Sequence, residues 1–315
     1  MFELKADDSQ RIPINSKLVS TVFYLVIFVL VISFQNEAQN KSNPNDEIFE
    51  LGMLKNSFVN VNMNDAKVAM TVWARELTKQ LNINVEFKLD LFDNTEELIK
   101  YNEKGNLGMV ILNSIDFLKL RSKMNLQPIL ISTDSKNIYN KLLIITRDEN
   151  VKDISDLRNK KIGFYLKRNN PVPKLWLDEL LYKNKLGTKE KFFSLISNFQ
   201  SESQLILSVF FGQTNAGVVT ESSFQTMCEL NPQVSKQLKI IMTSPNFIYD
   251  ISSLTQNSKR FSFSKRIIEI AAKIDTYAAG KEILTLMKTT QEVPYKPQYM
   301  VATEKLFNEW EAIKK

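Results

Sequence analysis

A single apolar run, residues 18–34, constrains this chain more than any other feature of its sequence. The run reads LVSTVFYLVIFVLVISF, contains no charged residue and directly follows Lys17. As a helix rising about 1.5 Å per residue, it lies at the short end of the lengths that cross a bilayer core. It lacks amphipathic spacing, and a polar segment follows it, so it differs from a buried core helix. We therefore expect the chain from residue 35 onward to be carried out of the cytoplasm.

The sequence leaves two interpretations of this run open, a cleaved secretory signal or an uncleaved membrane anchor. The polar segment 1–17 is long for a signal n-region, and its charges cancel. The nearest cleavage pattern, Asn36-Glu37-Ala38, is a poor one. These observations favour an anchor formed by residues 18–34. Residues 35–46 contain NEAQNKSNPND, which is polar and aperiodic, and we expect them to form a linker.

The residue types that are missing favour binding over catalysis. Histidine is absent, and Cys228 is the one cysteine, so no internal disulfide can form and the usual metal ligands and general base are lacking. We find no nucleotide-binding, hydrolase or metalloprotease motif. The net charge of +6 is spread along the sequence, which argues against nucleic-acid binding. We expect a protein that is not an enzyme and that has no cofactor and no metal.

From residue 47 onward, short apolar runs alternate with amphipathic segments, which is typical of an α/β fold. LGMVIL at residues 107–112 reads as a strand buried on both faces of a parallel sheet. A second block of the same kind begins after Arg147. The expected strands are 48–54, 85–89, 107–112, 128–132, 142–146, 161–166, 192–196, 216–219 and 238–242. The expected helices are 65–81, 94–104, 115–124, 171–185, 202–211, 220–229, 264–279, 281–288 and 302–313.

Four segments in this order resemble a known family. They are DLRNKKIGF at 156–164, GQTNAGVVTESSF at 212–224, KIIMTSPNFIYDI at 239–251 and AAGKEILTLM at 278–287. Together they resemble the phosphate/phosphonate-type periplasmic substrate-binding proteins of ABC transporters. The resemblance covers most of the chain after residue 47.

This resemblance implies a two-lobed Venus-flytrap of the type 2 periplasmic-binding fold, preceded by the N-terminal hydrophobic helix. Lobe one would comprise residues 47–141 and 252–315, and lobe two residues 148–242. Two hinge crossings, 142–147 and 243–251, would join the lobes. Phosphonate-binding members usually carry a Ser/Thr/Gly-rich turn after the first strand of lobe two. Here that turn reads Lys167-Arg168-Asn169-Asn170-Pro171, so the hydroxyl groups are missing.

In α/β sheets, ligands bind where strands end and helices begin. Three such places supply candidate ligand-binding residues. Asn113 and Ser114 follow the first buried strand and either bind ligand or cap a helix. Lys167, Arg168, Asn169 and Asn170 either hold an anion or form a solvated turn. Thr220 caps the next helix, where Glu221 either meets a ligand amine or favours the helix dipole. Phe58, which follows the first expected strand, either covers a ligand or packs in the core.

We therefore expect an exported, membrane-tethered binding protein that closes on a small anionic ligand. Its partner would be an ABC permease or a membrane sensor. The alternative is a signalling or interaction module that keeps the fold but has a degenerate pocket. The missing Ser/Thr turn and the anchor both favour that alternative. An enzyme on this scaffold is the weakest possibility, because histidine is absent.

Overall fold

The computed structural model describes residues 47–58, 62–80, 85–133, 138–166, 169–256, 269, 271–287 and 289–314. The chain divides into two units, Met1–Asp46 and Glu47–Lys315. The expected polar segment 1–17, the apolar run 18–34 and the linker 35–46 all lie outside the described residues. Within the described ranges, every helix is too short or too polar to cross a membrane.

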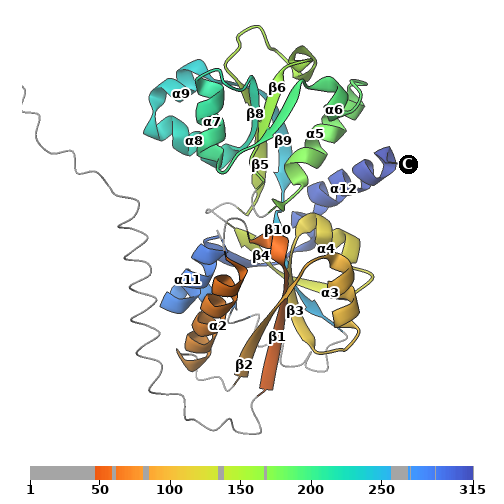
Figure 1. Ribbon diagram of the computed structural model, residues 1–315, viewed down its shortest axis with the longest axis vertical. Coiled ribbons are helices and arrows are strands. Elements are labelled where there is room, and N and C mark those ends of the chain that lie inside the picture. Colours follow the sequence, from red (N-terminus) through yellow and green to blue (C-terminus); the bar gives the residue numbers. More distant parts are fainter. Residues whose placement is uncertain are drawn as a thin grey trace, which may run out of the picture. The chain divides into compact units, whose positions relative to one another are not determined.

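The second unit contains two mixed sheets (Figure 1). The first has the order β11-β4-β10-β3-β1-β2, and β1 runs parallel to β2 and β3 while β10 is antiparallel to β3 and β4. Its strands are β1 Glu47–Leu54, β2 Val85–Phe92, β3 Leu107–Asn113, β4 Leu126–Thr133, β10 Asp250–Thr255 and β11 Gln291–Pro294. The second has the order β7-β6-β8-β5-β9, with β5 antiparallel to both of its neighbours. Its strands are β5 Asn140–Thr146, β6 Lys161–Phe164, β7 Leu195–Asn198, β8 Ala216–Thr220 and β9 Lys239–Phe247.

Helices cover both faces of each sheet (Figure 1). On the first sheet, one face carries α2 Met63–Gln80 and α11 Ala278–Leu286, and the other carries α3 Thr95–Asn102 and α4 Ser114–Leu120. On the second sheet, one face carries α5 Val172–Lys183, α6 Lys189–Phe192 and α12 Val301–Ile313. Its other face carries α7 Glu202–Phe210, α8 Glu221–Leu230 and α9 Pro232–Gln237. The described residues also form short 3-10 turns, η1 Lys55–Ser57, η2 Ile154–Leu157, η4 Ile274–Thr276 and η5 Pro297–Tyr299.

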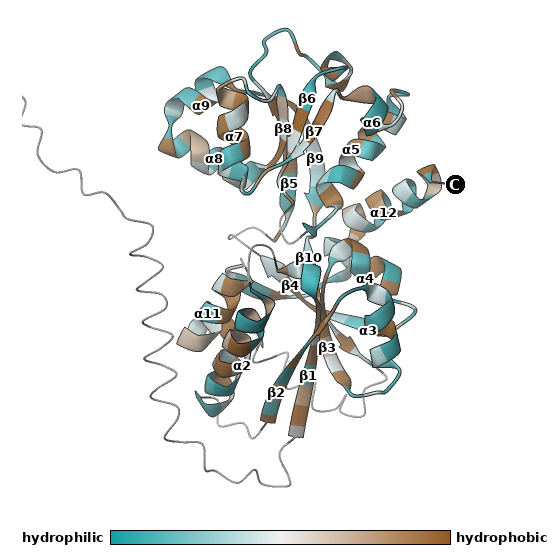
Figure 2. Cartoon of the chain, in the orientation of Figure 1, coloured by the Kyte–Doolittle hydropathy of each residue, from teal (hydrophilic) through white to brown (hydrophobic). Residues whose placement is uncertain are grey.

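The central strands β3 and β5 are apolar on both sides because both faces of each sheet are covered (Figure 2). In β5, Leu142 and Ile144 enter the core beneath α5, whereas Leu143 and Ile145 enter the core beneath α7 and α8. All four side chains are at most 1% exposed. Side chains alternate between the faces of a strand, so a continuous apolar run supplies two cores at once.

Local signals set several element ends as expected. The Asn94 side chain accepts a hydrogen bond from the Glu97 N–H and caps α3. Gly105 follows that helix with a φ of 72°, a left-handed conformation that glycine adopts without steric cost.

The last helix, α12, contacts the cores of both sheets. Met300, just before it, is buried in the core of the first sheet. Leu306 is buried against the second sheet, in the same cluster as Trp176 of α5. The Thr303 hydroxyl accepts a hydrogen bond from the Ile248 N–H at 3.0 Å, between β9 and β10. The C-terminal helix therefore binds the two sheets together at the place where the chain returns to the first one.

Several elements differ from those that the sequence predicts. Residues 189–192 form α6, and β7 begins only at Leu195, because the adjacent rings of Phe192 and Phe193 turn into the core instead of alternating. The expected strand 142–146 is confirmed as β5, and it pairs with β9, which contains residues 243–247. The role of 142–147 and 243–251 as hinge crossings stays a prediction. Most of the expected helix 264–279 lies outside the described residues, and its end forms η4 and the start of α11. The strand β11 was not expected.

Candidate functional site

The turn between β3 and α4 brings Asn113 and Ser114 to the end of a buried strand. The Asn113 side chain accepts the Asp116 N–H at 2.9 Å and donates to the Asp116 carboxylate at 2.7 Å, so it caps α4. Ser114 is fully buried, and its N–H donates to the Tyr249 carbonyl at 2.7 Å. Its hydroxyl has no hydrogen-bond partner among the described residues. At this turn, the Ser114 hydroxyl is therefore the group available to bind a ligand.

The turn between β6 and α5 contains four of the predicted site residues. Lys167 and Arg168 lie outside the described residues. Asn169 has a left-handed φ of 52°, and its amide donates to the Asn56 carbonyl at 2.5 Å. Asn170 is 1% exposed, and its side-chain oxygen accepts the N–H of Val172, the first residue of α5, at 2.9 Å. The asparagines at this turn therefore bond to the start of α5 and to backbone carbonyls near the first sheet.

Both turns converge on one backbone carbonyl, that of Tyr249. Ser114, next to the first sheet, donates its N–H to this oxygen, and Asn170, next to the second, donates its side-chain amide at 2.6 Å. Tyr249 lies between the end of β9 and the start of β10, where the chain passes from one sheet to the other. Sequence reasoning did not identify Tyr249, because a backbone acceptor leaves no signal in residue type.

The turn between β8 and α8 already holds a carboxylate from the protein itself. The Thr220 N–H donates to Glu202 Oε1 at 2.6 Å, and the Thr220 hydroxyl donates to Glu202 Oε2 at 2.8 Å. The Ser223 hydroxyl donates to the same Oε2. A helix N-terminus favours an anion, and Glu202 fills that role here. Glu202 was expected only as the start of a helix, although an acidic residue in a helix's first turn is the signal that could have drawn attention to it.

The remaining predicted site residues have structural roles. Glu221 forms an ion pair with Lys141 at 3.2 Å, and both side chains are about one-third exposed. Phe58 is 8% exposed and packs with Met53 and Met70 in the core beneath α2. The described residues contain no group of three His, Cys, Asp or Glu side chains that could hold a metal ion.

One cation near the β6–α5 turn has a perturbed pKa. Burial lowers the pKa of Lys174, in the first turn of α5, and the neighbouring charge of Lys189 lowers it further while Asp178 opposes the change. The Lys174 ammonium also lies over the Phe164 ring, 5.9 Å from its centroid. The contact with the Phe164 ring places this lysine against the core of the second sheet.

Comparison with known proteins identifies a family and a fold. The sequence matches the family described as "ABC transporter, phosphonate, periplasmic substrate-binding protein" over residues 61–299. No curated protein matches the sequence significantly.

Solved structures with similar folds include three that cover most of this chain. The protein XAC2383 from Xanthomonas citri, bound to chloride, has a TM-score of 0.59 at 11% identity and covers 85% of this chain and 98% of its own. PhnD1 from Prochlorococcus marinus, in complex with methylphosphonate, has a TM-score of 0.55 at 17% identity, with coverages of 85% and 99%. A binding protein component of an ABC phosphonate transporter from Pseudomonas aeruginosa has a TM-score of 0.53 at 14% identity, with coverages of 86% and 90%. At these identities the likeness concerns the fold.

Proposed function

We propose the following function for this chain, which belongs to the phosphonate-type periplasmic substrate-binding proteins of ABC transporters. It binds a small anionic ligand, phosphate- or phosphonate-like, between two lobes that close around it, and it delivers that ligand to an ABC permease. The proposal rests on the family match, which spans residues 61–299. Membership also places the folded part of the chain outside the cytoplasm.

The arrangement of the strand-end turns supports a ligand site near Tyr249. Ser114 and Asn170 come from turns next to different sheets and share its carbonyl as an acceptor. The buried Ser114 hydroxyl has no hydrogen-bond partner among the described residues, so a ligand oxygen there would satisfy it. In this proposal Lys167 and Arg168 supply the positive charge that an anion needs.

The acidic side chain of Glu202 limits where the anion binds. Its carboxylate accepts from the Thr220 N–H and hydroxyl, so the donors at the N-terminus of α8 are already engaged. A second negative charge beside it would be repelled. We therefore place the anionic group of the ligand at the turns after β3 and β6 and away from Thr220 and Glu221.

Thermal unfolding in the presence of defined anions tests this function. The full chain, purified with detergent, is heated with methylphosphonate, phosphate, sulfate or acetate at millimolar concentrations. We expect at least one tetrahedral oxyanion to raise the Tm saturably, because a ligand that binds only the folded state stabilises it.

We also propose that residues 18–34 are retained as a membrane anchor, because this run is uninterrupted by charge. The mass of the purified chain reports whether these residues are still present.

Charge reversal separates the predicted turn from the rest of the surface. Arg168→Glu should abolish the anion-induced shift, whereas Arg75→Glu, at an exposed position of α2, should leave it unchanged. If none of the four anions moves the Tm of the parent chain, the proposal of an anionic ligand is wrong. If Arg168→Glu retains the full shift, the anion binds elsewhere.

A further inference from the structure

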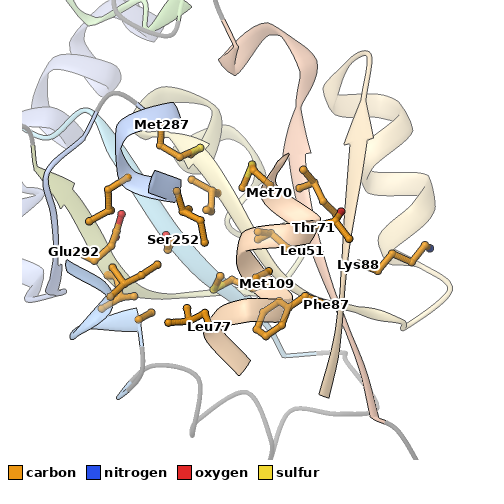
Figure 3. Close-up of a pocket in the computed structure, with 18 residues that line it drawn as sticks. Leu51, Met70, Thr71, Leu77, Phe87, Lys88, Met109, Ser252, Met287 and Glu292 are labelled. Atoms are coloured by element: carbon orange, nitrogen blue, oxygen red, sulfur yellow. The ribbon is translucent and has the colours of Figure 1, made fainter. Parts of the chain in front are cut away.

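A partly open cavity of about 110 Å³ lies in the first-sheet half of the molecule, between the sheet and helices α2 and α11 (Figure 3). Side chains from the two helices and from the strands beneath them form its wall. They include Met70 and Leu77 of α2, Met109 and Ile111 of β3, Ile283 of α11, and Met287 directly after that helix. All residues that line the cavity are among those that the structure describes, and none of them belongs to the candidate site around Tyr249.

The lining is almost entirely apolar. Ser252 of β10 and Glu292 of β11 are its buried polar members, 2% and 9% exposed. The Ser132 hydroxyl donates to Glu292 Oε1 at 2.6 Å, which anchors that carboxyl group at the wall. Lys88 contributes its stem only, because Figure 3 shows it directed away from the cavity and its ammonium pairs with Asp90 at 3.0 Å. The cavity therefore presents hydrocarbon and sulfur on most of its surface.

Such a surface selects against water and against ions. A buried water needs two to four polar partners, and this lining offers few. Moving an unpaired charge into an apolar site is costly, and a carboxyl group in the wall adds a further penalty for an anion. Apolar cavities of about 150 Å³ are known to stay dry and to bind benzene or xenon. The cavity here is slightly smaller than those.

We propose that this cavity is a second binding site, which takes a small uncharged apolar molecule about the size of a benzene ring. The ligand would contact the apolar faces of α2 and α11 and the strands β1, β3 and β4. Its chemistry is opposite to that of the anion proposed for the interlobe site. The two sites share no residue.

Benzene is the probe for this site, and the Tm of the full chain in detergent is the readout. We expect benzene to raise the Tm saturably, by about 3 °C once its free concentration exceeds the dissociation constant roughly tenfold. Ala74→Leu, which places extra carbon in the cavity, should remove this shift. Ala69→Leu makes the same change on the same helix outside the lining, and it should retain the shift.

A second variant covers the case in which the filled variant does not fold. Leu77→Ala enlarges the cavity, so it should lower the Tm without ligand and respond to benzene by a larger shift than the parent chain. The proposal is overturned if benzene leaves the parent Tm unchanged, or if parent, Ala74→Leu and Ala69→Leu all respond equally. Its failure is separate from that of the anion proposal, because the methylphosphonate and phosphate shifts are measured in the absence of benzene.

Discussion

At the scale of single residues, two carboxyl groups meet where α5 packs against α12. Burial raises the pKa of Glu179, and a hydrogen bond with Glu309 raises it further, while Lys183 partly opposes both effects. The hydrogen bond from Glu179 and the Lys183 ammonium lower the pKa of Glu309. Lys183 lies 2.5 Å from Glu179 and 2.8 Å from Glu309. Glu179 is the more buried of the two, so the shared proton belongs on it.

This pair makes the stability of the protein depend on pH. The folded pKa of Glu179 lies above its ordinary 4.5, so the folded state keeps a proton that the unfolded chain releases. The stabilisation is complete below the ordinary pKa and is lost as the pH rises through the raised value. Glu179→Gln mimics the protonated form, so we expect its Tm to exceed that of the parent chain at neutral pH. The difference should shrink as the pH falls to about 4.5.

Tm values measured across this pH range for both proteins check the prediction. Glu311→Gln, on α12 but outside the pair, provides the matched control and should follow the parent curve. A Glu179→Gln curve that lies below the parent curve at neutral pH would show that the Lys183 ion pair outweighs the buried charge.

At the scale of elements, the N-terminus of α8 holds Glu202 in the place of an anion. Glu202→Gln removes the negative charge but keeps a hydrogen-bond acceptor beside Thr220. We expect the unfolding free energy to fall by about 1 kcal/mol, because charge-assisted hydrogen bonds weaken. The affinity for a tetrahedral oxyanion should rise roughly tenfold, equivalent to ~1.4 kcal/mol, because the long-range repulsion between Glu202 and the bound anion is removed.

Titration calorimetry with methylphosphonate and phosphate measures that affinity, and denaturant unfolding measures the free energy. Glu229→Gln, exposed near the other end of α8, is the control and should change neither quantity appreciably. An unchanged or weaker affinity in Glu202→Gln would mean that the anion binds too far from α8 to sense this charge.

The sequence predicts elements well where residue type alone decides the outcome. The double-sided run of β5 and the cap at Asn94 are examples. It fails where tertiary packing decides. The strand β10 contains Ser252 and Ser253, which interrupt the apolar run, yet both are buried because the strand lies between β3 and β4. Short apolar runs such as the one at Phe192 also fit a strand and a helix equally well.

The candidate site is harder to predict than the fold, for a physical reason. An Asn or Ser at a strand end uses the same atoms to cap a helix and to hold a ligand. Sequence therefore located the turns at Ser114 and Asn170 but left their partner open. The partner is the Tyr249 carbonyl, which is far away in the sequence, and only the fold brings it within hydrogen-bond distance.

At the scale of the whole molecule, α12 determines how strongly the two sheets depend on each other. Leu306 is 1% exposed and packs in the cluster that contains Trp176 of α5 and Ile115 of α4. We expect Leu306→Ala to lower the unfolding free energy by about 3 kcal/mol, as for other buried leucines. Since α12 contacts both halves, both should lose stability.

Hydrogen exchange distinguishes a shared loss from a local one. Peptides from β3 and from β6 should both exchange faster in Leu306→Ala than in the parent chain. Val301→Ala removes side-chain carbon from the same helix at a position that is 63% exposed, and it should leave both peptides unchanged. Faster exchange in β6 alone would contradict the proposed coupling through α12.

The place of β10 in the first sheet bears on the order in which the chain can fold during synthesis. This strand lies between β4 and β3, yet it is made only after the whole of the second sheet. Domains usually fold from the N-terminus as they leave the ribosome. Here β1 to β4 emerge first, but the edges of β3 and β4 that pair with β10 stay unpaired until β10 is made. By that time β5 to β9 have all been synthesised. The growing protein is thus most vulnerable to aggregation in its oldest segment, which is where a chaperone would have to act.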